Sequence, residues 1–107
     1  MPKGILYVET RPSSPEEAAA YHQWYNETHL QEIVAIDGFV SARRFELLGE
    51  DGPFVAIYEL DADDLEATRA RLNETLKSGS TPVGVSFDPP PVMRFYQEIA
   101  AVGPGSA

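Results

Sequence analysis

Residues 21–45 read YHQWYNETHLQEIVAIDGFVSARRF, and this stretch decides how the rest of the chain can be arranged. It contains both histidines, the single tryptophan and two of the five tyrosines, and Gly38 divides it into a helical part and a strand part. At about 100° per residue, Tyr21, Tyr25, His29 and Ile33 share one face of the helix. That face combines aromatic, apolar and titratable side chains, whereas a helix that only packs against a core would carry aliphatic side chains there.

The sequence before this stretch predicts where the helix begins. Ser14 is a suitable N-cap, Pro15 fits the first helical position, and Glu17 stands three residues after the cap, as in a capping box. Gly38 supplies the end, because glycine readily adopts the left-handed conformation that follows many helices. We therefore expect one helix over residues 15–35.

Four strands and a second helix complete the predicted order. The strands are expected at residues 4–10, 39–48, 54–60 and 92–99, and the second helix, capped by Asp61 or Asp63, extends to about Lys77. A short extended piece at residues 83–87 would lie along an edge. The order βαββαβ predicts a ferredoxin-like α+β fold, with a four-stranded antiparallel sheet and both helices on one face. Residues 1–99 would form the single domain and residues 100–107 a flexible tail.

The third strand suggests a second subunit. Residues 54–58, FVAIY, are apolar on both strand parities, so both faces of this strand are expected to be buried. A domain of 107 residues cannot cover both faces of its own sheet. We expect a homodimer formed through the face that lacks helices.

Charge and composition exclude several classes of partner. With 17 acidic and 8 basic residues the net charge is −9, which repels a phosphate backbone, so nucleic acid is not expected as a partner. The chain has no cysteine and no apolar run long enough to span a membrane. We expect a soluble, cytoplasmic protein.

The central stretch also resembles a known family. The run His22-x-Trp24-Tyr25-x-x-x-His29 and the residues after it resemble the EthD-like branch of the dimeric α/β-barrel superfamily. The later positions that carry the resemblance are Glu32, Ile33, Asp37, Gly38, Phe39, Arg43, Arg44 and Phe45. The resemblance implies two ferredoxin-like subunits packed sheet against sheet. It implies no single activity, because the superfamily includes polyketide cyclases, lactone isomerases, dehydratases, monooxygenases and haem-degrading proteins.

His29 is the candidate catalytic residue. The resemblance matches it to a helical histidine that serves as an acid/base or substrate-orienting group, and imidazole exchanges protons near neutral pH. The alternative is a hydrogen-bonded core histidine. Glu32, three residues later, is placed either to orient His29 or to lie in solvent.

Further side chains are expected to bind the substrate. Adjacent strand residues face opposite sides, so at most one of Arg43 and Arg44 can reach the helix side. The sequence leaves open which one does, and Arg43 is included among the expected contacts. The alternative for either arginine is an ion pair with one of the abundant carboxylates. The expected substrate-binding residues are His22, Trp24, Tyr25, Glu32, Tyr7, Arg43, Tyr58 and Tyr96.

Neither a metal nor a cofactor is expected. The two histidines are separated by two helical turns and have no third well-placed ligand, which does not match zinc or facial-triad spacing. For haem, only the arginines would meet the propionates. The sequence therefore predicts a cofactor-independent enzyme that cyclises, dehydrates or isomerises an aromatic, polyketide-like or lactone molecule. The alternative is a non-catalytic dimer that binds a hydrophobic metabolite.

Overall fold

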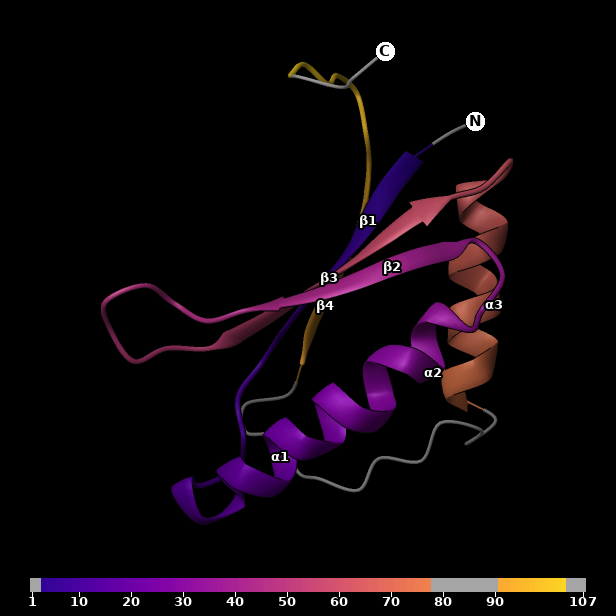
Figure 1. The fold of residues 1–107 in the computed structure, drawn as a ribbon. Coiled ribbons are helices and arrows are strands. Elements are labelled where there is room, and N and C mark those ends of the chain that lie inside the picture. The colour runs from indigo at the N-terminus through magenta and orange to yellow at the C-terminus, as the bar shows by residue number, and fades with distance from the viewer. Residues whose placement is uncertain (1–2, 78–90, 104–107) are drawn as a thin grey trace.

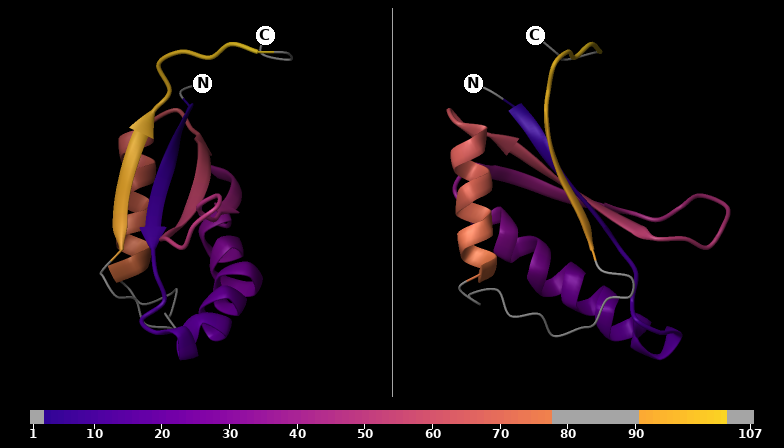
Figure 2. Two further views of the ribbon diagram at one scale, coloured as in Figure 1. Left: turned by 90° about the vertical axis from the view of Figure 1, so that its left-hand side faces the viewer. Right: turned by 180° about the vertical axis from the view of Figure 1, so that it is seen from behind.

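A computed structural model, which describes residues 3–77 and 91–103, has the predicted ferredoxin-like architecture (Figure 1). The strands are β1 (Lys3–Thr10), β2 (Phe39–Phe45), β3 (Phe54–Asp61) and β4 (Val92–Gln97). They form one antiparallel sheet in the order β2-β3-β1-β4. The helices lie together on one side of this sheet, as the two views of Figure 2 show, and the opposite side carries none of the described helices.

The first helical segment is interrupted along its length. It consists of a 3₁₀ turn η1 (Pro15–Glu17), helix α1 (Ala18–Trp24), a π-helical turn η2 (Tyr25–His29) and helix α2 (Leu30–Val34). Ser14 caps it as predicted, since its Oγ accepts from the Glu17 amide at 3.3 Å. Only this half of the expected capping box forms within the described chain. The segment therefore has the predicted extent, but the regular helix expected over residues 15–35 was wrong at its centre.

Several predicted boundaries also differ from the structure, by one residue at the start of β1 and at the end of β3 and by more elsewhere. β2 ends at Phe45 rather than residue 48, and β4 ends at Gln97 rather than residue 99. Helix α3 (Leu65–Lys77) is capped by Asp64, whose carboxylate accepts from the Ala67 amide at 3.2 Å, and not by Asp61 or Asp63. Residues 83–87 and the tail beyond 103 lie outside the described residues.

Gly38 is required where the first helical segment meets β2. Its φ is 101°, and a Cβ built on it would lie 2.7 Å from Oγ1 of Thr68 on α3. Any side chain there would therefore be strained and would also push α3 away from the sheet. The glycine fixes how closely the two helical elements pack.

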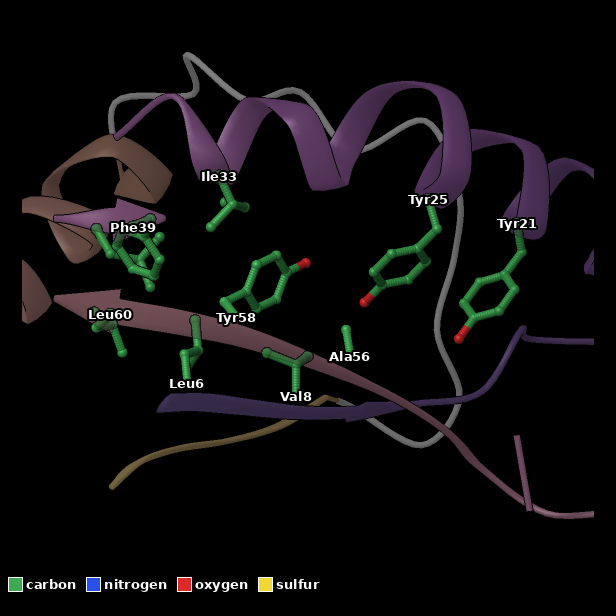
Figure 3. Packing of buried hydrophobic residues seen from close by; sticks show 10 residues of the cluster. Leu6, Val8, Tyr21, Tyr25, Ile33, Phe39, Ala56, Tyr58 and Leu60 are labelled. Atoms are coloured by element: carbon green, nitrogen blue, oxygen red, sulfur yellow. The ribbon is translucent and has the colours of Figure 1, made fainter. Parts of the chain in front are cut away.

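The core lies between the helices and one face of the sheet (Figure 3). Leu6 and Val8 of β1 and Tyr58 of β3 point toward the helices, where Ile33 and Tyr25 meet them. The alternate residues of the same strands, such as Tyr7 and Ile57, point to the open face, because successive side chains of a strand alternate. One sheet face is thus covered by this chain and the other is not.

The open face leads us to expect a homodimer. Replacing Ile57, at the centre of this face, by glutamate should place a charge in the interface and give a monomer, because a buried unpaired charge is costly. Ala70→Glu on the exposed surface of α3 adds the same charge elsewhere and should leave the dimer intact. Analytical ultracentrifugation at micromolar concentration checks both, and a monomeric wild-type protein would contradict the expectation.

Candidate functional site

A cavity of about 180 Å³ lies between the first helical segment and the covered face of the sheet. Its walls come from every layer of the fold, including α3 and β4. Most of the lining is aliphatic, with aromatic rings and a few polar atoms among it. The described residues that line it are Leu6, Val8, Trp24, Tyr25, His29, Ile33, Tyr58, Leu72, Leu76, Pro91 and Met93.

The π-helical turn η2 brings Trp24 and His29 onto the same wall. In an α-helix, residues five apart lie about 140° apart around the axis, so their side chains do not meet. The wider turn at Tyr25–His29 removes this offset, and the Trp24 and His29 rings stack with centroids 4.2 Å apart and planes 16° apart. Tyr25 meets the edge of the same imidazole at 5.3 Å. Single π turns inside helices are often found at functional sites.

His29 is largely buried, and its Nδ1, which is fully buried, has no hydrogen bond to a described residue. This atom lies 3.7 Å from Oε1 of Glu32, which is also buried and without a hydrogen bond in the described chain. The separation is too long for a hydrogen bond but allows attraction. Burial dominates the electrostatics and lowers the pKa of His29 to about 4, so the ring is neutral at physiological pH. Of the two positions considered for Glu32, beside His29 or in solvent, the structure shows the first.

Tyr58 brings a second polar group into the cavity, from the sheet side. Its ring rises from β3 toward the helical segment, between Ile33 and Tyr25 (Figure 3). The ring is 1% exposed, and its hydroxyl has no hydrogen-bond partner among the described residues. Burial raises the pKa of Tyr58, and the nearby Tyr25 adds to this effect, so the hydroxyl keeps its proton. An unpaired buried hydroxyl costs free energy in the empty protein.

The arginine on the helix side is Arg44, so Arg43, which stood among the expected substrate-binding residues, does not reach the cavity. A β-bulge between Phe39 and Ser41 shifts the pairing of β2 by one residue, and residues after it reverse the face they occupy. Arg43 consequently points to the open face and forms an ion pair with Glu59 at 2.9 Å. Arg44 lies over the Tyr25 ring at 4.6 Å, behind the cavity wall.

His22 lies beside this arginine and not on the cavity wall. Arg44 approaches its Nδ1 at 3.2 Å and donates to Oδ1 of Asn26 at 2.9 Å. Because a guanidinium has only donors, Nδ1 of His22 accepts this hydrogen bond. Burial, followed by the charge of Arg44, lowers the pKa of His22. The partners of His22 explain it as a structural residue.

Two of the three strand tyrosines predicted for the pocket lie on the other side of the sheet. Tyr7 pairs in register with Ile57 on the open face, and its hydroxyl donates to Oε1 of Glu9 at 2.8 Å. Tyr96 is 48% exposed and follows the same parity. Neither lines the cavity, and both predictions were wrong. Tyr58, Trp24 and Tyr25 do line it.

The sequence reasoning missed most of the aliphatic lining. Leu72 and Leu76 of α3 and Leu6 and Val8 of β1 line the cavity, and none of them is among the residues expected at the site. The parity of β1 separates Leu6 and Val8 from Tyr7, but parity does not say which set faces the helices. The apolar face of α3 was the one available signal.

Metal coordination has little support from the described residues. Within residues 3–77 and 91–103, no group of three or more histidine, aspartate or glutamate side chains is arranged to hold a metal ion. Over the same ranges, no helix is long and apolar enough to cross a membrane.

Comparison with known proteins gives a match at the level of fold. No family model and no curated protein matches the sequence. A monooxygenase from the gene ActVA-Orf6 of Streptomyces coelicolor, solved with the ligand nanaomycin D, superposes with a TM-score of 0.64 and 16% identity over 96% of this chain and 93% of its own. A protein of unknown function from Nitrosomonas europaea gives 0.62 and 20% identity over 97% and 96%.

An EthD family protein from Bacillus halodurans is also similar, with a TM-score of 0.56 and 13% identity over 92% of this chain and 100% of its own. The fold expected from the resemblance to the EthD-like branch is therefore confirmed. At these identities the likeness concerns the fold, and the chemistry has to be argued from the site.

The burial of His29 predicts a pH dependence of stability. The folded protein takes up the His29 proton near pH 4, whereas the unfolded chain does so near pH 6.5. Since the unfolded state binds more protons between these values, the free energy of unfolding should fall as pH decreases from 6.5 to 4. His29 accounts for on the order of 3 kcal/mol of this loss. Denaturant unfolding at a series of pH values, compared with His29→Asn, isolates the contribution, and parallel curves for the two proteins would refute it.

The unpaired hydroxyl of Tyr58 predicts an unusual effect on stability. Tyr58→Phe removes a buried group that has no partner among the described residues, so stability should be unchanged or rise by about 1 kcal/mol. Tyr21→Phe is the matched control, because the Tyr21 hydroxyl is hydrogen-bonded to Oγ1 of Thr10. Its loss should cost about 0.5–1.5 kcal/mol. Thermal unfolding measures both, and a clear loss of stability in Tyr58→Phe would mean that its hydroxyl is paired.

Proposed function

We propose that this protein is a small-molecule enzyme in which His29 transfers a proton within the 180 Å³ cavity. The substrate class is aromatic, polyketide-like or lactone, and the reaction is a cyclisation, dehydration or isomerisation that needs no cofactor. One observation carries the proposal. His29 and Tyr58 both line a cavity whose remaining walls are largely apolar, and the buried hydroxyl of Tyr58 has no hydrogen bond among the described residues; a few polar groups in an apolar cavity are the composition of ligand sites in general.

The walls would hold and orient a flat molecule. Trp24 and Tyr25 form the helical wall, and Leu6 and Val8 form the floor on the sheet. Apolar contact on both sides supplies affinity without directing chemistry. The polar atoms of His29 and Tyr58 then decide which way round the substrate lies.

The chemical step depends on His29 and Glu32. In the empty cavity the imidazole is a weak base, because no charge nearby offsets its desolvation strongly enough. When a substrate begins to lose a proton to it, the new imidazolium lies 3.7 Å from the Glu32 carboxylate and next to the developing negative charge of the substrate. Both charges favour the protonated ring, so the proton affinity of His29 rises as the reaction proceeds.

The structural neighbours are compatible with a small-molecule site. One of them is a monooxygenase solved with nanaomycin D, so this fold accommodates a small-molecule ligand in that protein. This supports small-molecule binding by the present chain. It carries no argument for oxidation here.

A second function is favoured by the low pKa of His29. A histidine that protonates only near pH 4 is far from the value that suits a general base at neutral pH. The same cavity would then bind a hydrophobic metabolite without turning it over. The two functions differ in one measurable respect, since a binding protein leaves its ligand chemically unchanged.

Substitution of His29 tests the proposed enzyme. On a substrate found by screening small aromatic ketones, phenols and lactones, His29→Asn should lower turnover by about 10² to 10⁴, the usual contribution of a positioned proton-transfer group. Melting temperature measured on the same preparation shows whether the fold is retained. Retention of wild-type turnover would remove His29 from the mechanism.

The other histidine provides a matched control. His22 lies two turns earlier on the same helical segment and accepts from Arg44 outside the cavity. His22→Asn should therefore affect stability and leave turnover per folded molecule near the wild-type value. If the screen finds compounds that bind but are not converted, the protein is a binding protein and the proposed enzymatic function is wrong.

A further inference from the structure

The hydroxyl of Tyr58 defines one requirement for the ligand. It is buried on the sheet side of the cavity and keeps its proton, because burial raises the pKa of Tyr58. No described residue accepts a hydrogen bond from it. A ligand that satisfies this group offers an acceptor, of which a carbonyl oxygen is the simplest.

His29 defines a second requirement. The carboxylate oxygen of Glu32, 3.7 Å from Nδ1, favours the tautomer with the hydrogen on Nδ1. Nε2 of the neutral ring then holds a lone pair and accepts. Within the described chain no hydrogen bond reaches Nε2, so the matching ligand group is a donor such as a hydroxyl.

Charge and size restrict the ligand further. Among the described residues no lysine or arginine lines the cavity, and Arg44 lies behind the Tyr25 ring with its donors directed at His22 and Asn26. An anion would lose its hydration without gaining a cation, which is costly. A cavity of about 150 Å³ can hold benzene, so the volume of about 180 Å³ fits one substituted ring.

We propose, building on the proposed function, that the ligand is an uncharged aromatic hydroxy-carbonyl compound whose hydroxyl faces Nε2 of His29 and whose carbonyl faces the hydroxyl of Tyr58. In the proton transfer, the ligand O–H bond breaks and an N–H bond forms at Nε2. The electron pair stays on the ligand and spreads through the ring to the carbonyl oxygen, where Tyr58 donates to it. The step involves no oxidation or reduction.

Four probes of similar size separate these requirements. 4-Hydroxyacetophenone has both groups, 4-methoxyacetophenone has only the acceptor, 4-ethylphenol has only the hydroxyl, and 4-hydroxybenzoate is an anion. The fluorescence of Trp24, the single tryptophan, reports occupancy because its ring lines the cavity, and calorimetry checks the affinities. We expect 4-hydroxyacetophenone to bind roughly tenfold or more tightly than each of the other three, because each of them leaves a buried group unpaired or introduces a buried charge.

Two variants identify which protein group hydrogen-bonds to the hydroxyl of the ligand and which to its carbonyl. Tyr58→Phe should abolish the advantage of 4-hydroxyacetophenone over 4-ethylphenol and keep its advantage over 4-methoxyacetophenone. His29→Leu should do the reverse. Such ligand-by-variant cycles remain interpretable if either substitution changes stability, because each compares two ligands on one protein.

The outcomes distinguish this inference from the proposed function. If the three neutral probes bind equally well, or the anion binds best, the inference is overturned while a ligand-binding cavity remains. If no probe and no compound of the wider screen changes the Trp24 fluorescence or the melting temperature, the proposed function fails with it.

Discussion

The π-helical turn at Tyr25–His29 is the constraint on which the arrangement of the site depends. It changes the angular relation between residues before and after it, so that Trp24 stacks on His29 instead of pointing away from it. It also leaves Tyr25 and Ile33 directed at the sheet, where they meet Tyr58 and the β1 side chains (Figure 3). A regular α-helix over the same residues would keep the apolar face but lose the stacked wall of the cavity. The local departure from ideal helix geometry and the cavity are therefore one feature of the molecule.

Most of the fold could be predicted from the sequence because it follows from local chemistry and alternation. Ser14 and Pro15 start the helical segment, Gly38 takes the positive φ that ends it, and the strands reveal themselves by β-branched and aromatic residues. The side of the sheet that each strand residue faces was harder to predict, because it depends on pairing. The bulge after Phe39 exchanges the sheet faces that the later residues of β2 occupy, so Arg44 and not Arg43 lies on the helix side. No residue type in that strand predicts the bulge. Likewise, nothing in residues 25–29 distinguishes a π turn from an α-helical one.

The two histidines illustrate how similar sequence positions acquire different roles through their partners. His22 accepts from Arg44, which also lies over aromatic rings and bonds Asn26, so the polar groups of this cluster satisfy one another. His29 meets a carboxylate at a distance too long for a hydrogen bond, in surroundings that lower its pKa to about 4. Both lie on one face of one helical segment, and sequence periodicity treats them alike. The pairing of β2 with β3, which directs Arg44 to His22, is what separates them.

The cavity concentrates features that lower stability, and this concentration supports a binding role. A buried hydroxyl on Tyr58, a desolvated imidazole and a carboxylate oxygen without hydrogen bonds in the described chain occur within one small region, together with the π turn. Elsewhere in the described chain, the buried Thr10 and Thr68 are hydrogen-bonded, and Oδ1 of Asp61 is buried without a hydrogen bond to a described residue. Sequences are locally consistent with their folds except where function requires otherwise, so several costs in one place point to a common cause. A ligand that accepts a hydrogen bond from Tyr58 removes one of these costs, and a ligand group that donates to Nε2 of His29 gives the desolvated ring a polar contact. The affinity of such a ligand would then come from these polar contacts as well as from apolar contact with the cavity walls.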